Sequence, residues 1–312
     1  MSPLPEPLLD AVPREVPTRT PSMPWWQGWA PLLLLPWPVP FLAPAEWPRW
    51  VVMWLLAFVI FCGCKWLTWR RTLSVGVPAW RHLAYLVAWP GLDAPAFLRI
   101  DLAQPVKSPS GLEWLFALAK FSLGLVTLFG LARLVPAAYP YLVGWVGMVG
   151  IVLLLHFGLF HLLSCLWRMR GVEARPLMNW PLAATSLSDF WGRRWNTAFR
   201  DLTHRFLFRP LMARLGPSGA VFAGFVFSGL VHEAVISWPA GGGWGGPTVF
   251  FLLQGVGILV ERSNGARSLG LGEGWRGWLF AMLLLLLPVP LLFHGPFVVG
   301  VIVPFLHAVG AV

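Results

Sequence analysis

Long apolar runs follow one another along this chain of 312 residues, and they restrict the folds that it can adopt. A bilayer core about 30 Å thick is crossed by about 20 apolar residues in a helix. Lipid offers no hydrogen-bond partners, so each crossing segment must satisfy its own backbone, as a helix does. We therefore expect an all-α, polytopic membrane protein. Its apolar runs are Trp50–Trp69, Leu112–Leu134, Tyr141–Trp167, Ala220–Trp238, Thr248–Val260, Trp275–His294 and Phe297–Val312.

The composition supports the same class of protein. Hydrophobic residues make up 57% of the chain and charged residues 12%, against about 25% charged residues in a typical soluble domain. The 21 tryptophans suit the headgroup region of a bilayer, where indole rings prefer to lie. The net charge of +10 comes from Lys and Arg between the apolar runs, so we expect no binding of nucleic acid. Cys62, Cys64 and Cys165 lie in apolar runs without a zinc-type spacing, which indicates small buried residues.

The N-terminal third is less regular than the rest of the chain. Residues 1–24 combine prolines with charges of both signs, and we expect an irregular cytoplasmic tail there. The apolar run Trp25–Leu42 is interrupted by four prolines, which remove backbone hydrogen bonds and predict a broken or interfacial segment. Val77–Pro90 is short and partly polar, as in a re-entrant segment, and Gly91–Gly111 is expected to be a loop. Residues 25–312 are expected to form a single membrane domain.

The charges of the connections predict the orientation of the chain. The connections after Leu67, Trp167 and Val260 are rich in Arg and Lys, so the positive-inside rule places them in the cytoplasm. Pro239–Pro247 and Gly295–Pro296 carry no charge and are expected on the far side. This alternation predicts about eight transmembrane segments with a cytoplasmic N-terminus, in the inner or cell membrane if the protein is bacterial. We find no internal repeat of the kind that marks many transporters.

The run Ala220–Trp238 carries two ionisable residues, His232 and Glu233, about two-thirds of the way along. Such groups cost about 2.5–3.5 kcal/mol each in the middle of a membrane helix, so the pair is a candidate functional site. The sequence also allows a purely structural polar pair. His-Glu is followed by Ala-Val-Ile, so the H-E-x-x-H zinc motif is absent. His156 and His161 are five residues apart, on different faces of a helix, which indicates packing or supporting roles.

Residues 168–217 are the most basic segment of the chain, and we expect them on the cytoplasmic face. Within them, Ser186 and Asp189 form a capping-box type of helix start. A stripe at helical spacing follows, which predicts one continuous amphipathic helix over Ser186–Leu211, lying along the membrane surface. Its arginines either face lipid headgroups or hold the phosphates of an anionic cosubstrate. The stripe consists of Trp191, Trp195, Phe199, Leu202 and Phe206.

Two stretches, DFWGRRWN (Asp189–Asn196) and FSGLVHE (Phe227–Glu233), resemble the membrane-bound O-acyltransferase (MBOAT) superfamily, most closely its wax synthase-like branch. The resemblance implies that His232 is the catalytic histidine and that Asn196 is the second active-site residue. In relatives, the acyl group comes from a thioester, usually acyl-CoA, and a lipid alcohol enters from the bilayer. The implied substrate-binding residues are Asp189, Trp191, Arg193, Arg194, Trp195 and Ser228.

Elementary chemistry agrees with these roles. An alcohol that attacks a thioester needs a base for its hydroxyl proton, and imidazole has the side-chain pKa closest to neutral pH. The amide of Asn196 suits the acyl carbonyl or the charge that develops on it. Ser228, one helical turn before His232, is placed to orient the ring. Glu233 lies about 100° around the helix and is expected to pair with a neighbouring helix. We expect neither a metal nor a permanently bound cofactor.

We therefore expect a membrane-embedded O-acyltransferase that makes wax esters, or else sterol esters or triacylglycerols, from acyl-CoA and a lipid alcohol. Acylation of a glycan or a small alcohol by the same centre is an alternative. A transporter or channel that uses His232 and Glu233 is the alternative of a different class. The expected partners are acyl-CoA, the lipid alcohol and membrane lipids.

Overall fold

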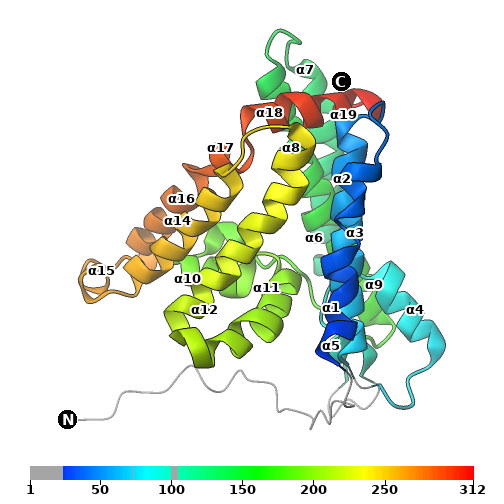
Figure 1. Ribbon diagram of the computed structural model, residues 1–312, viewed down its shortest axis with the longest axis vertical. Helices are drawn as coiled ribbons and strands as arrows, with labels where there is room; N and C mark the ends of the chain where they lie inside the picture. Colours follow the sequence, from blue (N-terminus) through cyan, green and yellow to red (C-terminus); the bar gives the residue numbers. More distant parts are fainter. Residues whose placement is uncertain (1–23, 73, 100–104) are drawn as a thin grey trace.

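The computed structural model describes residues 24–72, 74–99 and 105–312. Within these ranges every regular element is a helix, which confirms the all-α class. Figure 1 shows long helices standing side by side, with α4 (Ala79–Ala88) and α5 (Ala94–Leu98) at one end. The C-terminal helix α19 (Val303–Ala308) lies at the opposite end. The expected tail, apart from Pro24, lies outside the described residues.

Five helical segments are long and apolar enough to cross a membrane, as expected for a polytopic protein. Two more apolar helical segments, Gly246–Glu261 (α14) and Gly295–Ala308, are shorter. The proline-rich first run is broken into α1 (Trp25–Leu34) and α2 (Pro38–Leu42), as its prolines predicted. The five long segments are Arg49–Arg70 (α3), Gly111–Leu134, Pro140–Met169, Thr197–Ala240 and Gly274–Leu292.

Three of the long segments change helix type along their length, and two of these pack against each other. Gly111–Leu134 comprises α6 (Gly111–Val126), the π-helical η1 (Thr127–Leu131) and α7 (Ala132–Leu134). Pro140–Met169 comprises α8 (Pro140–Val152), the π-helical η2 (Leu153–Leu159) and α9 (Phe160–Met169).

Glycines allow these two segments to approach closely. A Cβ on Gly124 would lie 2.4 Å from the backbone nitrogen of Leu154, and one on Gly158 would lie 2.6 Å from Cα of Phe121. Such contacts between backbones are typical of helix pairs in membranes, where small residues line the interface. These contacts hold η2 in place against α6.

The expected continuous helix over Ser186–Leu211 is wrong, because the chain leaves helical geometry at Trp195 and Asn196. Backbone hydrogen bonds to an earlier segment replace the helical ones: Asn179 N donates to Arg194 O at 2.8 Å, and Thr197 N donates to Leu177 O at 3.0 Å. The elements there are α10 (Leu187–Asp189), η4 (Phe190–Arg194), α11 (Thr197–Thr203) and η5 (His204–Phe208).

The helix with the His–Glu pair begins earlier than its apolar run. It comprises α12 (Arg209–His232), η6 (Glu233–Ser237) and α13 (Trp238–Ala240). The backbone bends at Gly216, where φ is 68°, a conformation that glycine adopts at little cost. The part of α12 after this bend packs along α14.

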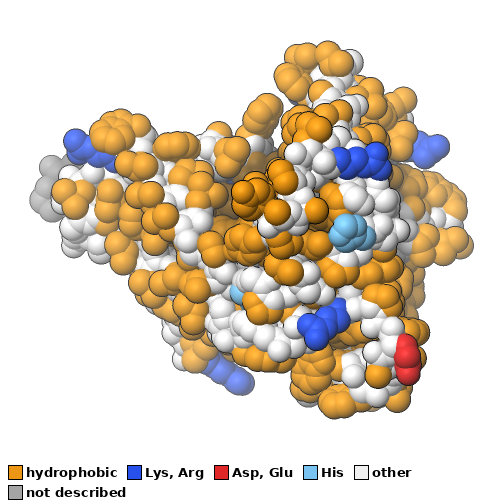
Figure 2. Space-filling model, turned by 90° about the horizontal axis from the view of Figure 1, so that it is seen from above, with side chains coloured by type: hydrophobic (Ala, Val, Ile, Leu, Met, Phe, Trp, Pro, Cys, Tyr) orange, Lys and Arg blue, Asp and Glu red, His pale blue; other side chains and the backbone are white. Residues whose placement is uncertain are grey.

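The remaining elements complete the bundle. The expected loop Gly91–Gly111 contains the short helix α5, whose first turn is capped by the carboxylate of Asp93. The other helices are the 3₁₀ helix η3 (Pro181–Ala183), α15 (Asn264–Ser268), α16 (Gly274–Leu286), α17 (Val289–Leu292), α18 (Gly295–Phe297) and the π-helical η7 (Val298–Ile302). In Figure 2, hydrophobic side chains cover most of the face seen from above, and charged ones are few.

Candidate active site

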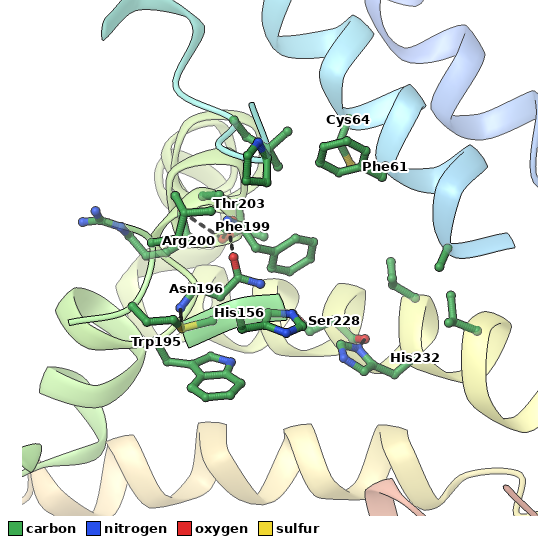
Figure 3. Close-up of a pocket in the computed structure, with 18 of the residues that line it drawn as sticks. Phe61, Cys64, His156, Trp195, Asn196, Phe199, Arg200, Thr203, Ser228 and His232 are labelled. Carbon is green, nitrogen blue, oxygen red and sulfur yellow. Dashed lines mark hydrogen bonds between the residues drawn. The ribbon is translucent and has the colours of Figure 1, made fainter. Parts of the chain in front are cut away.

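A cavity of about 1490 Å³ lies among the helices, and both expected catalytic residues line it. Its wall is mostly apolar, with contributions from α3, η2, the α10–α11 region, α12 and α14. In Figure 3, His232, Ser228, His156 and Asn196 succeed one another along one side of this space. The sequence separates Asn196 from His232 by 36 residues, and the fold brings them to the same cavity.

His232 is the last residue of α12, directly before the π-helical η6. Its Nδ1 lies 2.7 Å from the carbonyl oxygen of Ser228, which can only accept a hydrogen bond. Nδ1 therefore carries the proton, and Nε2 keeps its lone pair. The ring also packs on Phe251 of α14, with centroids 4.6 Å apart. These contacts prepare a neutral imidazole whose free nitrogen is able to accept a proton.

Ser228 orients the His232 ring, but with its backbone rather than its hydroxyl group. The hydroxyl donates to the carbonyl oxygen of Gly224 at 3.0 Å, one turn back along α12. Ser228 also lines the cavity.

Glu233 turns away from His232 and contacts the start of α14. Its Oε1 accepts hydrogen bonds from the backbone nitrogen of Thr248 at 3.1 Å and from its hydroxyl at 2.9 Å. A carboxylate at the first turn of a helix is also favoured by the helix dipole. Gly229 permits the close approach, since a Cβ there would lie 2.8 Å from Cα of Thr248. The structure thus gives Glu233 the neighbouring-helix partner that we expected.

Asn196 occupies the break between η4 and α11. It adopts a left-handed backbone with φ of 41°, which Asn tolerates better than most residues. Its Oδ1 caps α11 by accepting from the nitrogen of Phe199 at 3.2 Å. Because the oxygen is engaged in this way, the NH₂ group is the part of the amide that it offers to the cavity. Strained conformations of this kind often occur at functional sites.

The other expected substrate-binding residues fall into two groups. Trp191 and Trp195 line the cavity. Asp189 is buried and forms ion pairs with Arg193, at 2.9 Å, and with Arg194. None of these three residues lines the cavity. The Arg193 side chain is 76% exposed. These ion pairs hold the turn that carries the two tryptophans.

Two supporting residues in α14 escaped the sequence analysis. The buried carboxylate of Glu261 accepts from the backbone nitrogens of Leu187 at 2.7 Å and Ser188 at 2.9 Å, so it caps the start of α10. The buried Gln254 lies 3.5 Å from the indole nitrogen of Trp191. These two polar residues are seven apart in an apolar run, which places them on one helix face. That spacing could have identified them.

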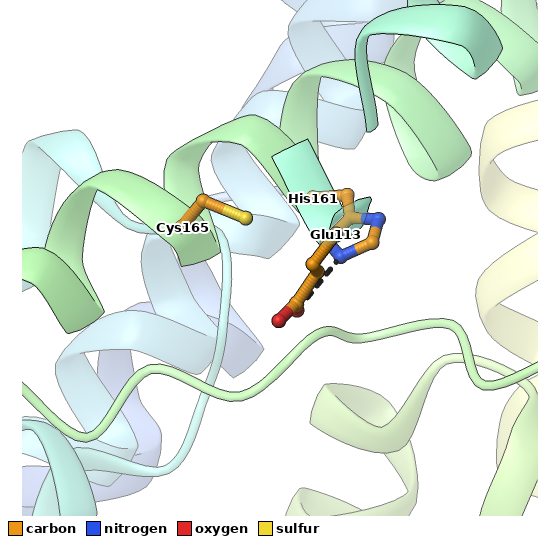
Figure 4. Close-up of side chains that lie close together, drawn as sticks. All are labelled: Glu113, His161 and Cys165. Carbon is orange, nitrogen blue, oxygen red and sulfur yellow. Dashed lines mark hydrogen bonds and ion pairs between the residues drawn. The ribbon is translucent and has the colours of Figure 1, made fainter. Parts of the chain in front are cut away.

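A cluster of potential metal ligands lies elsewhere, at the junction of α6 and α9. Glu113, His161 and Cys165 have ligand atoms within 4.8 Å of one another (Figure 4). However, Oε1 of Glu113 already accepts from His161 Nε2 at 3.1 Å and from Arg168. Lys120 Nζ lies 2.7 Å from the other ring nitrogen of His161. Arg168 thus compensates the carboxylate directly, Lys120 contacts the histidine behind it, and we interpret the cluster as a polar network that joins two helices.

Comparison with known proteins now adds to this geometry. Residues 174–253 match the model of the membrane bound O-acyl transferase family, and this segment contains Asn196 and His232. Over this segment the chain is similar to that family. The match also covers Gly229, Glu233 and Thr248, the contact between α12 and α14.

Several similar proteins are named long-chain-alcohol O-fatty-acyltransferases, which confirms the wax synthase-like resemblance of the sequence. One is a long-chain-alcohol O-fatty-acyltransferase of Simmondsia chinensis, 34% identical over 141 residues, or 35% of this chain and 38% of that protein. Another is a probable long-chain-alcohol O-fatty-acyltransferase 1 of Arabidopsis thaliana, 36% identical over 107 residues, or 29% of each chain. A third is acyl-CoA–sterol O-acyltransferase 1 of Arabidopsis thaliana, 40% identical over 74 residues, or 22% of this chain and 21% of that protein. This chain therefore spans well under half the length of these relatives.

Proposed function

We propose that this protein transfers a fatty acyl group from acyl-CoA to the hydroxyl group of a lipid alcohol. The observation that carries the proposal is the arrangement of His232, with a free Nε2 at a cavity that Asn196 also lines. The names of the similar proteins agree, since they refer to long-chain alcohols and to a sterol as acyl acceptors.

The reaction follows from the chemistry of these groups. Nε2 of His232 takes the hydroxyl proton while the alcohol oxygen attacks the thioester carbon. The new C–O bond forms, and negative charge develops on the carbonyl oxygen, which the NH₂ group of Asn196 stabilises. The C–S bond then breaks, and the proton on His232 passes to the leaving thiolate. The products are an ester and free CoA, and His232 returns to its neutral form.

The lining of the cavity suits both substrates. Its apolar wall, which includes Phe61 and Phe225, provides a surface for an acyl chain and a lipid alcohol. Arg200 and Arg262 also line it and supply positive charge for the phosphates of CoA. We propose that these residues, with Trp191 and Trp195, bind acyl-CoA from the cytoplasmic side. The Arg- and Lys-rich connections lie on that side by the positive-inside rule.

The alternatives receive less support. A proton or substrate pathway through His232 and Glu233 would need both groups at the cavity, but Glu233 does not line it and is engaged by Thr248. A glycan acceptor fits poorly with a mostly apolar wall, because its hydroxyl groups would be left without partners.

Lipid analysis of an expressing host tests the proposal. We expect new esters of long-chain alcohols or sterols when the wild-type protein is produced and the alcohols are supplied. They should be absent with His232→Ala. His307→Ala, at an exposed histidine of α19 outside the cavity wall, is the matched control and should keep full ester formation. Equal ester levels with wild type and His232→Ala would contradict the proposal.

A further inference from the structure

His156 is another polar residue of the cavity, and the proposed acyl transfer does not use it. It lies in η2, the π-helical part of the segment Pro140–Met169, and it lines the cavity. The sequence indicated a packing or supporting role for His156, and its place on the cavity wall opens a direct role. π-Helical turns inside longer helices are rare and often occur at functional sites. An imidazole inside a membrane segment is also costly, so it needs a reason.

The surroundings of His156 determine which ring nitrogen is available. Nδ1 is fully enclosed and has no hydrogen-bond partner among the described residues. Enclosed N–H groups without an acceptor are rarer than enclosed acceptors without a donor, so the lone pair belongs on Nδ1. The proton is then on Nε2, and the ring presents a donor to the cavity. Phe160, with its ring centroid 5.2 Å away, packs against the imidazole.

The two histidines thus have opposite tautomers. The carbonyl of Ser228 keeps the proton of His232 on Nδ1, so that ring presents an acceptor. His156 presents a donor, and Figure 3 shows its ring between Asn196 and His232. A base on one side and two donors on the other are the groups that a thioester carbonyl and an attacking alcohol require.

We propose that His156 is a further catalytic residue, which donates a hydrogen bond from Nε2 to the carbonyl oxygen of the acyl group. The inference rests on the proposed acyl transfer. As the alcohol oxygen adds to the carbonyl carbon, the pair of electrons of the C=O double bond moves to the oxygen. His156 and the NH₂ group of Asn196 hold this oxyanion until the C–S bond breaks. The proton of His156 stays on His156 throughout.

Three substitutions distinguish this role from a structural one. His156→Gln places an amide nitrogen near the position of Nε2, His156→Asn places one near Nδ1, and His156→Leu has no donor. We expect His156→Leu and His156→Asn to lower kcat by about 100-fold, as loss of an oxyanion donor does in other enzymes, with a smaller change in KM. His156→Gln should retain much more of the wild-type kcat. Thermal unfolding in detergent should show His156→Leu as stable as the wild type, because an unpaired nitrogen is removed.

Wild-type activity and acyl-CoA binding separate this inference from the proposed function. If the wild type forms ester but His156→Leu keeps kcat within threefold, or His156→Gln falls as far as His156→Leu, the role of His156 is refuted alone. If the wild type forms no ester, binding of palmitoyl-CoA without alcohol still reports the contact. His156→Leu should then weaken binding by about three- to tenfold and His156→Gln should not. Equal binding by all variants would overturn the inference.

Discussion

The contact between Gly229 and Thr248 offers a sharp test of how α14 supports His232, the proposed catalytic base. In Gly229→Ala the new Cβ would lie 2.8 Å from Cα of Thr248, about 1 Å inside an ordinary carbon–carbon contact. The two helices must therefore separate by about 1 Å. The bonds of 2.9 Å and 3.1 Å from Thr248 to Glu233 would lengthen beyond hydrogen-bonding distance.

The expected magnitude follows from these contacts. Overpacking costs about 1–3 kcal/mol, and each hydrogen bond to a charged group contributes about 1.5–3 kcal/mol. Ala instead of Gly in a helix returns about 1 kcal/mol. With both hydrogen bonds lost, these contributions add to a net loss of stability of about 3–8 kcal/mol. Phe251, three residues after Thr248, would move away from the His232 ring, and a displacement of 1 Å can lower a rate by about 100-fold.

Thermal unfolding in mild detergent and ester formation by the purified variant measure both effects. Gly130→Ala is the matched control, because a Cβ on this helical glycine meets only Val126, at 3.9 Å. It should remain as stable and as active as the wild type. Helix propensity alone predicts that Gly229→Ala is neutral or stabilising. Full activity and unchanged stability in Gly229→Ala would therefore refute the support that we assign to α14.

Two further predictions concern the segment around Asn196. Asn196→Ala should lower kcat by about 100-fold, since it removes an oxyanion donor. It should lower stability by about 2 kcal/mol, since it also removes a helix cap and a residue suited to positive φ. Kinetics and thermal unfolding measure these losses, and a change in stability without a change in kcat would contradict the catalytic role. Glu261→Leu should lower stability by about 2–4 kcal/mol, because two backbone N–H groups lose their charged acceptor, while Glu273→Leu, at an exposed residue, should not. Equal unfolding midpoints for these two variants would contradict the role of Glu261 as a cap.

The sequence allowed much of the fold to be predicted, because membrane helices have a strong local signal. Apolar runs and prolines located the long helices and the interruption between α1 and α2. The direction of Glu233 relative to His232 was also predictable, since consecutive residues of a helix are rotated by about 100° around its axis, whatever the rest of the fold. Its partner, Thr248, lies only 15 residues away.

The finer features of the site depend on contacts between distant segments. Helical spacing continues through Trp195, but the helix breaks there, where backbone hydrogen bonds with Leu177 and Asn179 replace the helical ones. The direction of His156 was not predictable from α-helical spacing, because its helix is π-helical at that point. For Ser228 the residue was predicted but not the atom, since helix spacing does not distinguish a hydroxyl group from a backbone carbonyl.

The central claim is that His232 accepts the proton of an alcohol that attacks an acyl thioester. The most direct measurement uses purified protein with palmitoyl-CoA and hexadecanol, following free CoA thiol and ester together. The wild type should release one thiol for each ester formed, and only when the alcohol is present. His232→Ala should fold with unchanged helical content, bind palmitoyl-CoA and form ester at less than about one-hundredth of the wild-type rate. Ester formation by His232→Ala at the wild-type rate would contradict the claim.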